Sequence, residues 1–459
     1  MIPFRIVALI ATAFITSSAF ALAFPGAEGY GKHTVGGRGG RVYVVTNLND
    51  RGPGSLREAV EAKGARVVVF AVGGNIHLDS PLRIGNDSIT ILGQTAPGDG
   101  VCLCDCQLSV SASEVIVRYL RVRVGNKYRR DTDALGGGRY GQHNVVLDHL
   151  SVSWSIDECL SIYKTKDLTV QWCLITHSLT NSLHTKGSHG FGGIWGGYRA
   201  TFHHNLLANH SSRNPRFSSV DGTKWVDMRN NAIYNWGYKC GYGGGHHAEV
   251  NIVDNYYKPG PASRSHTFFS VSEDRTGRYY INGNVMEGDD DVTNDNRKGV
   301  ADRPGLPYYP SSGNAKSTRG IHPDAIPTPG DTTSSSLVDT PFPYEAIAVE
   351  TAREAYHRVL QSVGCSFHRD DYDAAVVSQV TNGTATFGNK GMIDDPSEVG
   401  GLPRLRKGKS PKDTDHDGMP DRWERAHGLN PSDASDASIS TLSAHYTNIE
   451  VYANSLLGY

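Results

Sequence analysis

The segment Arg213-Asn214-Pro215-Arg216 combines residue types that suit the binding of an acid. An arginine guanidinium grips a carboxylate through a planar fork of donors. Pro215 restricts the backbone of the residue before it and stiffens the turn that carries Arg213. A Phe-His-His-Asn run at 202–205 precedes this turn. The pattern indicates chemistry on acidic sugars, and a surface arginine paired with an acidic neighbour is the alternative interpretation.

A second candidate site lies near the C-terminus, where residues 413–424 match the twelve-residue calcium loop. Acids occupy positions one, three, five and nine, Gly418 permits the sharp turn at position six, and glutamate stands at position twelve. Pro420 and the lack of a second copy in the sequence distinguish the loop from a paired EF-hand. We expect a structural Ca²⁺ that orders a terminal module, and a solvated acidic turn is the alternative. The oxygen ligands would come from Asp413, Asp415, Asp417 and Glu424.

Short β-rich segments with glycine-rich turns must position the first of these sites. Each segment contains one apolar anchor, and the anchors recur at intervals of 23 to 32 residues, by subtraction of their numbers. A repeat of this length without helical periodicity predicts a solenoid. The anchors are Ile91, Val117, Leu147, Val170, Phe202, Met228, Ile252 and Ile281.

An asparagine stands three residues after each of the last four anchors, at Asn205, Asn231, Asn255 and Asn284. Stacked asparagines can hydrogen-bond to the next coil and satisfy backbone groups that a tight turn leaves unpaired. This ladder predicts an all-β fold, a right-handed parallel β-helix in which each coil buries an inward row. A β-propeller is the alternative, although its blades need roughly 40 residues and four antiparallel strands.

Four segments divide the chain. Residues 1–23 form a predicted signal peptide, with Arg5, an apolar run and a small-residue cleavage site, and they imply a secreted or periplasmic protein. Polar residues interrupt the apolar run, which makes a membrane anchor the weaker interpretation. Residues 24–300 form the predicted β-helix, 301–405 an extended loop with helices at 344–363 and 372–380, and 406–459 the EF-hand-like calcium module. A helix at 55–62 would cap the open end of the coil.

Composition excludes some partners. A net charge of -2 and a pI near 6.8 provide no basic field, so we expect no nucleic-acid partner. Nothing in the sequence indicates an assembly interface, and a monomer is expected. Cys102, Cys104 and Cys106 alternate and would share one face of a strand. We interpret them as small packing residues, with a zinc cluster as the alternative.

The sequence resembles family 1 polysaccharide lyases, the pectate lyases, of a secreted bacterial type, over roughly residues 24–284. The resemblance is carried by FPGAEGYG at 24–31, Leu147-Asp148-His149, Asp157, and His203-His204-Asn205 leading to Arg213 and Pro215. It implies a lyase that cleaves α-1,4-linked polygalacturonate by calcium-assisted β-elimination and leaves 4,5-unsaturated galacturonate ends.

The resemblance also implies roles for the basic residues. Arg213 matches the family base that removes the C5 proton, and activity should rise above neutral pH because a guanidinium is ordinarily protonated. A second family arginine falls on Ser218 here, and we expect Arg216 to bind the substrate carboxylate instead. His203 and His204 are expected to have hydrogen-bonded structural roles. Further substrate contacts are expected from Lys186, His189 and Lys239.

The catalytic Ca²⁺ ligands implied by the resemblance are Asp131, Asp133, Asp157 and Ser161. Ser161 replaces an acid of the family pattern, which should weaken calcium binding in the enzyme without substrate. Glu158 should point away from Asp157 if the segment is extended, and it is left out of the ligand set. Solvated acids near a turn are the alternative.

Other functions remain open at this point. A pectin lyase acting on methylated pectin would not need calcium; Ser161 is compatible with it, whereas Asp133 and Asp157 argue against it. A hydrolase such as a polygalacturonase would need a cluster of three aspartates and a histidine-glycine signature, and the middle of the sequence has no such constellation. A non-catalytic β-helix adhesin or glycan-binding protein would share the ladder but has no reason to place Arg213 opposite acids.

Overall fold

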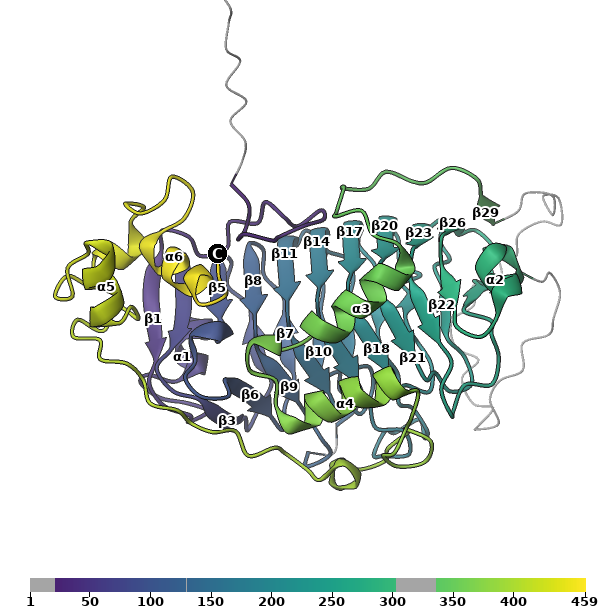
Figure 1. Cartoon of the computed structure of the whole chain (residues 1–459), viewed down its shortest axis with the longest axis horizontal. Helices are drawn as coiled ribbons and strands as arrows, with labels where there is room; N and C mark the ends of the chain where they lie inside the picture. Colours follow the sequence, from purple (N-terminus) through teal and green to yellow (C-terminus); the bar gives the residue numbers. More distant parts are fainter. Residues whose placement is uncertain (1–20, 129, 303–335) are drawn as a thin grey trace, which may run out of the picture.

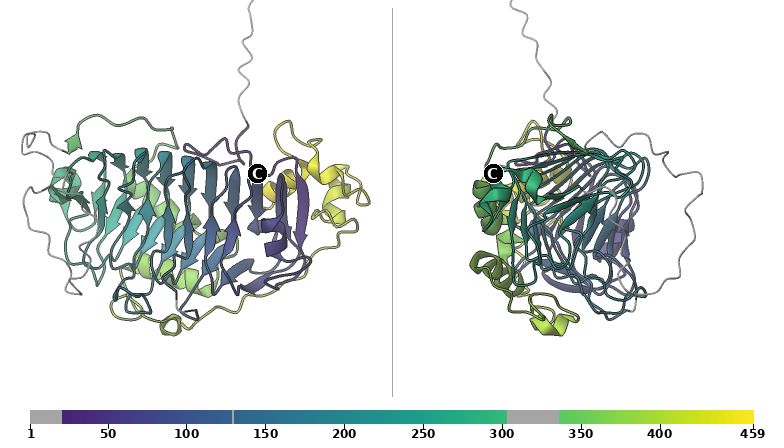
Figure 2. Two further views of the ribbon diagram at one scale, coloured as in Figure 1. Left: turned by 180° about the vertical axis from the view of Figure 1, so that it is seen from behind. Right: turned by 90° about the vertical axis from the view of Figure 1, so that its right-hand side faces the viewer.

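The protein is described by a computed structural model over residues 21–128, 130–302 and 336–459. Three parallel sheets wind around one core and form a parallel β-helix, as predicted (Figures 1 and 2). Nine successive coils each contribute one strand to each sheet, in the order A, B, C along the chain, and sheet A has one further strand at either end. The signal-peptide prediction, apart from its last three residues, and residues 303–335 of the predicted loop lie outside the described residues.

Within the described residues, sheet A has eleven strands and sheets B and C have nine each. Sheet A contains β1 (Arg41–Val45), β2 (Arg66–Phe70), β5 (Ile89–Leu92), β8 (Val115–Arg118), β11 (His143–Asp148), β14 (Lys166–Gln171), β17 (Tyr198–His203), β20 (Lys224–Arg229), β23 (Glu249–Val253), β26 (Arg278–Asn282) and β29 (Leu337–Val338). Sheet B contains β3 (Gly74–His77), β6 (Val101–Cys104), β9 (Arg121–Arg123), β12 (Ser151–Ser153), β15 (Leu174–Thr176), β18 (Leu206–Ala208), β21 (Ala232–Tyr234), β24 (Tyr256–Lys258) and β27 (Val285–Met286). Sheet C contains β4 (Leu82–Ile84), β7 (Leu108–Val110), β10 (Leu135–Gly137), β13 (Leu160–Ile162), β16 (Ile194–Trp195), β19 (Arg216–Phe217), β22 (Gly241–Gly243), β25 (Phe269–Val271) and β28 (Val300–Ala301).

All eight predicted anchors lie in sheet A and pair in register with one another. Ile91 pairs with Val117, and the series continues without a slip to Ile252 and Ile281. A slip of one residue would turn the anchors out of the core, so burial of this row fixes the register.

Two-residue turns join sheet A to sheet B in seven coils. The first turn residue is left-handed, with φ between 51° and 70°, and the second points inward. The left-handed residues are Tyr119, His149, Trp172, His204, Asn230, Asp254 and Gly283. Four of them stack their rings in sequence, with centroids 4.6, 5.9 and 4.2 Å apart from Tyr119 to His204.

The inward residues of the last four of these turns form the predicted asparagine ladder. Asn205, Asn231 and Asn255 each donate a side-chain N–H to the amide oxygen of the next rung, at 3.0, 2.9 and 3.0 Å. Asn284 extends the ladder to Asn296 at 3.1 Å. His203 and His204 are fully buried beside the ladder and hydrogen-bond to each other, so they belong to the scaffold.

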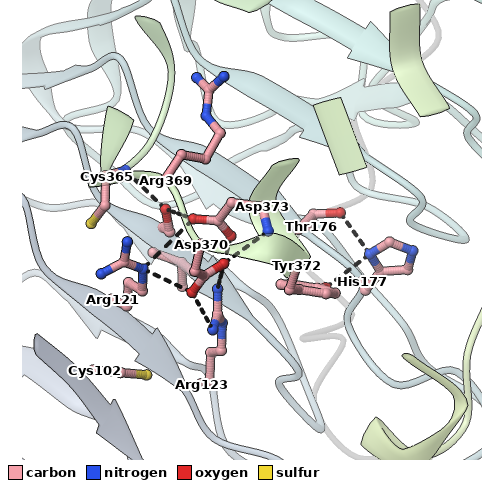
Figure 3. A network of polar contacts seen from close by, with 12 residues as sticks. Cys102, Arg121, Arg123, Thr176, His177, Cys365, Arg369, Asp370, Tyr372 and Asp373 are labelled. Carbon is pink, nitrogen blue, oxygen red and sulfur yellow. Dashed lines mark hydrogen bonds and ion pairs between the residues drawn. The ribbon is translucent and has the colours of Figure 1, made fainter. Parts of the chain in front are cut away.

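Two helices cover sheet B (Figure 1). Helix α3 (Ala352–Ser362) begins later than predicted, because Thr351 and Glu354 form a capping box, and α4 (Asp371–Asn382) ends at the left-handed Gly383. Figure 3 shows how α4 docks. Arg121 and Arg123 of β9 lie fully buried against Asp370 and Asp373, with Arg123 Nη1 2.8 Å from Asp370 Oδ2. Removing one partner would leave a buried charge unpaired and cost about 3–5 kcal/mol.

The C-terminal module lies at the opposite end of the chain from β1 in sequence but beside it in space (Figure 1). It contains α5 (Asp421–His427) and α6 (Asn448–Ser455), and Met419 and Ile449 pack against the outer face of β2 at Val67 and Val69.

The remaining helical segments are α1 (Leu56–Glu61), capped by Ser55 as predicted, α2 (Asp290–Asn294), and the 3-10 turns η1 (Gly93–Thr95), η2 (Asn296–Gly299), η4 (Ser366–His368), η5 (Pro396–Val399) and η6 (Asp436–Ser438).

The cysteine prediction is partly wrong. Cys102 and Cys104 face outward and pack against Leu405, whereas Cys106 lies in the main core. The strand ends at Cys104, and the left-handed Asp105 turns the chain, so the alternation does not continue. All seven cysteines are buried free thiols. No helix in the described part of the chain is long and apolar enough to cross a membrane.

Candidate active site

Five successive connections from sheet B to sheet C bring the predicted catalytic residues together. These connections are much longer than the two-residue turns from sheet A to sheet B. Asp131 and Asp133 come from the connection before β10, and Asp157 and Glu158 from the one before β13. Those before β16, β19 and β22 carry, in order, His184 with Lys186, His189 and Phe191, then Arg213, then Lys239.

The acids form one cluster. Carboxylate oxygens of Asp133, Asp157 and Glu158 lie within 4.8 Å of one another, and Asp133 Oδ1 accepts the backbone N–H of Glu158 at 3.2 Å. Asp131 accepts the backbone N–H of Thr185 at 2.9 Å and also its hydroxyl. The structure therefore brings Asp133 and Asp157 together, whereas Asp131 bonds to Thr185 and lies on the other side of His184 from Asp157. Metal binding by these aspartates remains a prediction.

Crowded charge is visible in the pKa values of this cluster. Burial, reinforced by Asp157, raises the pKa of Asp133 well above its usual range. Burial alone would raise the pKa of Asp157 too, but the hydrogen bond from His189 and the charges of His189, His184 and Arg213 lower it. The Thr185 hydroxyl lowers the pKa of Asp131. Such a cluster needs positive charge, which is what a cation site provides.

The prediction for Glu158 is wrong. It assumed an extended segment, but Asp157 lies in a bend just before β13, and Glu158 turns its buried carboxylate into the same cluster. Its Oε1 atom forms an ion pair with Nη1 of Arg213. Glu158 is therefore both the partner of Arg213 and a further candidate ligand.

Arg213 has the strained backbone that its turn requires, with φ at 59°. Its side chain is 17% exposed, lies over the ring of Phe191 at 4.2 Å, and donates from Nε to the Tyr242 hydroxyl at 3.3 Å. A non-glycine residue with positive φ costs about 1–3 kcal/mol and persists where its surroundings determine it. These contacts hold the guanidinium beside the acids.

Ser161 lies on β13, where its hydroxyl accepts the backbone N–H of Ile194 at 3.0 Å. It pairs in register with Gly136, and a Cβ on Gly136 would lie 2.8 Å from Asp133 Oδ2. Ser161 is thus one strand away from the acid cluster. Its role as a calcium ligand remains a prediction.

Basic residues continue the site along the coil axis. Arg216 of β19 pairs in register with Tyr242 of β22, and the Tyr242 ring lies 5.9 Å from the Arg216 guanidinium and 4.3 Å from Lys239 Nζ. Burial, with the nearby charge of Arg216, lowers the pKa of Lys239, partly offset by Glu273. Lys186 is exposed on the connection before β16. Tyr242 was not among the predicted residues, although it lies one coil after Arg216, and that spacing could have identified it.

Two histidines cover Asp157. The rings of His184 and His189 stack with centroids 3.4 Å apart, and Nε2 of His189 lies 3.2 Å from Asp157 Oδ1. His184 Nε2 is 3.6 Å from Asp157 Oδ2 and 3.8 Å from Asp131 Oδ2. Burial and the neighbouring His189 lower the pKa of His184. His189 was predicted to contact substrate, whereas His184 was missed because its loop shows no periodicity.

The predicted calcium loop gathers acids at the other end of the molecule. Oxygens of Asp413, Asp415 and Asp417 lie within 4.8 Å of one another, as do those of Asp417, Glu424 and Asp436. Burial, with the charges of the neighbouring acids, raises the pKa of Asp417 to about 8 and of Glu424 to about 7.

Comparison with known proteins decides the family. A protein named "Probable pectate lyase C" from Aspergillus terreus is 37% identical over 445 residues, which cover 95% of this chain and 94% of its own length. The protein of the same name from Emericella nidulans is 37% identical over 444 residues, covering 95% of this chain and 93% of its own. The chain belongs to the pectate lyase family. No protein-family model matches it.

Solved pectate lyases support the fold. A pectate lyase bound to a hexasaccharide superimposes with a TM-score of 0.51 at 12% identity, covering 76% of this chain and 99% of its own. The two relatives described above are fungal, and a further relative, "Probable pectate lyase 5" of Arabidopsis thaliana, is 30% identical over 33% of this chain and 41% of its own length. These relatives do not support the bacterial type predicted from the sequence.

Proposed function

We propose that this protein is a secreted pectate lyase that cleaves α-1,4-linked polygalacturonate by β-elimination. The observation that carries the proposal is the convergence of Arg213 with Asp133, Asp157 and Glu158. A proton next to a carboxylate is hard to remove, because negative charge builds up on a group that is already anionic. A base beside a cation-binding cluster of acids meets that requirement.

Arg213 is the proposed base. Its neutral guanidine takes the C5 proton, and the C5–H electron pair forms the C4–C5 double bond. O4 leaves with the electrons of the C4–O4 bond and takes a proton from solvent, and the guanidinium of Arg213 returns its proton to solvent, so the number of protons is unchanged. No water is consumed, and the product carries a 4,5-unsaturated end. Arg213 must first leave Glu158, while the Tyr242 hydroxyl at 3.3 Å from Nε keeps the guanidinium oriented.

The acid cluster fits Ca²⁺, which prefers oxygen ligands in flexible geometry. The proposed ligands are Asp131, Asp133, Asp157 and Ser161, and the position of Glu158 adds it to the set. When bound, calcium supplies positive charge that neutralises the substrate carboxylate.

The polysaccharide is proposed to lie along the coil axis. Adjacent coils are about 4.8 Å apart, so the side chains from β10 to β22 span four steps, or about 19 Å. Acids occupy the first two of these coils and the basic residues Arg213, Arg216 and Lys239 the last two. An extended polyuronate would meet a cation at successive coils, and Lys186 and His189 would contact it between them.

The first experiment measures ultraviolet absorbance of unsaturated product from polygalacturonate, with calcium and with chelator. We expect a calcium-dependent rise in the wild type and its loss in Arg213→Ala, while Arg353→Ala, an exposed arginine on α3, behaves as wild type. A rise that survives chelation would favour methylated pectin or a calcium-free mechanism. No rise under any condition would favour a glycan-binding protein. The same preparation tests whether the protein is a monomer. Its N-terminal sequence after export tests the predicted extracytoplasmic location.

A further inference from the structure

The C-terminal acids include one that the twelve-residue loop does not contain. Asp436 begins η6, twelve residues after Glu424, yet its carboxylate lies within 4.8 Å of the ligand oxygens of Asp417 and Glu424. Asp417 also belongs to the group with Asp413 and Asp415. Five carboxylates from three local segments therefore form two adjoining groups that share Asp417.

Several of these oxygens are buried without a partner. Glu424 is 0% exposed, Asp417 2% and Asp436 8%. Both oxygens of Glu424, Oδ2 of Asp417 and Oδ1 of Asp436 find no hydrogen-bond partner among the described residues. The same is true of both oxygens of Asp415. Burying charged carboxylates together is unfavourable by several kcal/mol per group unless a positive charge compensates them.

The nearby basic side chains do not supply that charge, because they are used elsewhere. Asp421, at position nine of the loop, turns away from the cluster and accepts the Thr414 backbone N–H at 2.8 Å. Lys412 Nζ lies 2.8 Å and Arg425 Nη2 3.2 Å from Asp421 Oδ2. Position nine is thus occupied by an internal salt bridge, and Asp436 presents a carboxylate to the cluster instead.

We propose that Asp413, Asp415, Asp417, Glu424 and Asp436 bind one Ca²⁺, and that Asp436 makes this ion fasten the C-terminal module to the first coils of the β-helix. The five donors are all carboxylate oxygens, which suits a hard cation. The site is independent of the proposed lyase reaction.

The fastening follows from what η6 contacts. Ala437, next to Asp436, is buried in the cluster that contains Val67, Val69 and Met419. Ser438 Oγ donates to the Gly40 backbone oxygen at 2.9 Å, just before β1. Calcium held between Glu424 of α5 and Asp436 of η6 therefore joins α5 to the element that touches the first strand. Without the ion, repulsion among the acids acts directly on this joint.

The test compares Asp436→Asn with Asp433→Asn, which removes an exposed acid three residues earlier in the same segment. Both are made in an Asp133→Asn, Asp157→Asn background, so that calcium at the catalytic cluster does not contribute. Calorimetry measures the affinity for calcium. Thermal unfolding with calcium and with chelator measures how much the bound ion stabilises the attachment of the module. Limited proteolysis reports release of the module.

We expect Asp436→Asn to lower calcium affinity at least tenfold and to lose most of the calcium-induced rise in melting temperature, while Asp433→Asn keeps both. In chelator, Asp436→Asn should melt no lower than its parent, because it relieves repulsion. Asp415→Asn, at a partly exposed position, should show the same loss. It keeps the test decisive if Asp436→Asn does not fold. Equal affinities for the Asp436 and Asp433 variants, or a parent with no calcium-induced shift, would overturn the proposal.

Discussion

Replacing Asn231 tests whether the asparagine ladder holds the coils together. Its Nδ2 donates to the backbone oxygens of Phe202 at 2.9 Å and Arg229 at 3.0 Å, and to Asn255 Oδ1 at 2.9 Å. Its Oδ1 accepts from the backbone and side-chain nitrogens of Asn205, at 2.9 and 3.0 Å. Only 1% of the residue is exposed, so water cannot replace these bonds.

Asn231→Ala should lower the free energy of unfolding by about 3–7 kcal/mol. The substitution leaves at least two buried groups, the Asn205 backbone N–H and the Phe202 carbonyl, without this partner, and each orphaned group costs about 1–3 kcal/mol. The vacated volume adds about 1 kcal/mol. Asn231→Asp keeps the acceptor but places a buried carboxylate against three oxygens, and it should cost at least as much.

The assay is urea unfolding followed by circular dichroism at neutral pH. Asn382→Ala is the matched control, because Asn382 is an exposed asparagine of α4 that bonds only one turn back, to Ser378. The control should change stability by less than about 0.5 kcal/mol. A loss below about 1 kcal/mol for Asn231→Ala would refute the conclusion that the ladder satisfies otherwise orphaned groups.

Three further predictions concern the site and the buried histidines. Glu158→Gln removes a carboxylate from the acid cluster, so calcium binding measured by calorimetry should weaken on the order of tenfold, and activity at limiting calcium should recover with excess calcium. Tyr242→Phe removes the hydroxyl that holds Arg213 and should lower kcat by about threefold to tenfold, with KM little changed. Burial lowers the pKa values of His177 and His203 to about 3. Since these side chains take up protons near pH 6.5 when unfolded, stability should fall as pH drops from 6.5 toward 3, by about 2 kcal/mol per histidine between pH 7 and 5.

Each of these has its own control. Unchanged calcium affinity in Glu158→Gln would mean that Glu158 serves only as the partner of Arg213. Tyr242→Ala also removes the ring beside Arg216 and Lys239, so it should raise KM as well; a KM effect in the phenylalanine variant would argue against a role for the hydroxyl in orienting Arg213. Unfolding in urea at pH 7 and 5 should show a smaller acid loss in His203→Gln than in wild type, and equal losses would contradict the assignment.

The repeat could be predicted from the sequence because the same residue types recur at equivalent positions in successive coils. An apolar anchor such as Phe202 and a turn asparagine such as Asn205 recur with burial on one side, and stacking allows only one register. Cys106 shows where this reasoning fails, since a single left-handed residue ended the alternation. The first residue of a helix also depends on its cap. Thr351 caps α3, so the helix begins later than predicted.

The site was predictable only in part, because its residues lie on connections with no period. Arg213 and the aspartates were found through a resemblance, and the stacking of connections explains why they converge. Glu158 was misplaced by assuming extended backbone in what is a bend. Asp436 could not be reached from a twelve-residue pattern, since only the return of the chain through η6 brings it to Glu424.

The same coils carry scaffold and site on different connections, which separates their energetics. In seven coils the turn from sheet A to sheet B is two residues long, and these turns carry the hydrogen-bonded asparagines and the stacked rings. Connections from sheet B to sheet C are longer and retain unbalanced charge, as in the raised pKa of Asp133. Electrostatic strain at functional groups is tolerated when the rest of the structure compensates for it. Substitutions in the asparagine ladder should therefore lower the free energy of unfolding with little effect on kcat. Substitutions in the acid cluster should lower kcat with little effect on the free energy of unfolding.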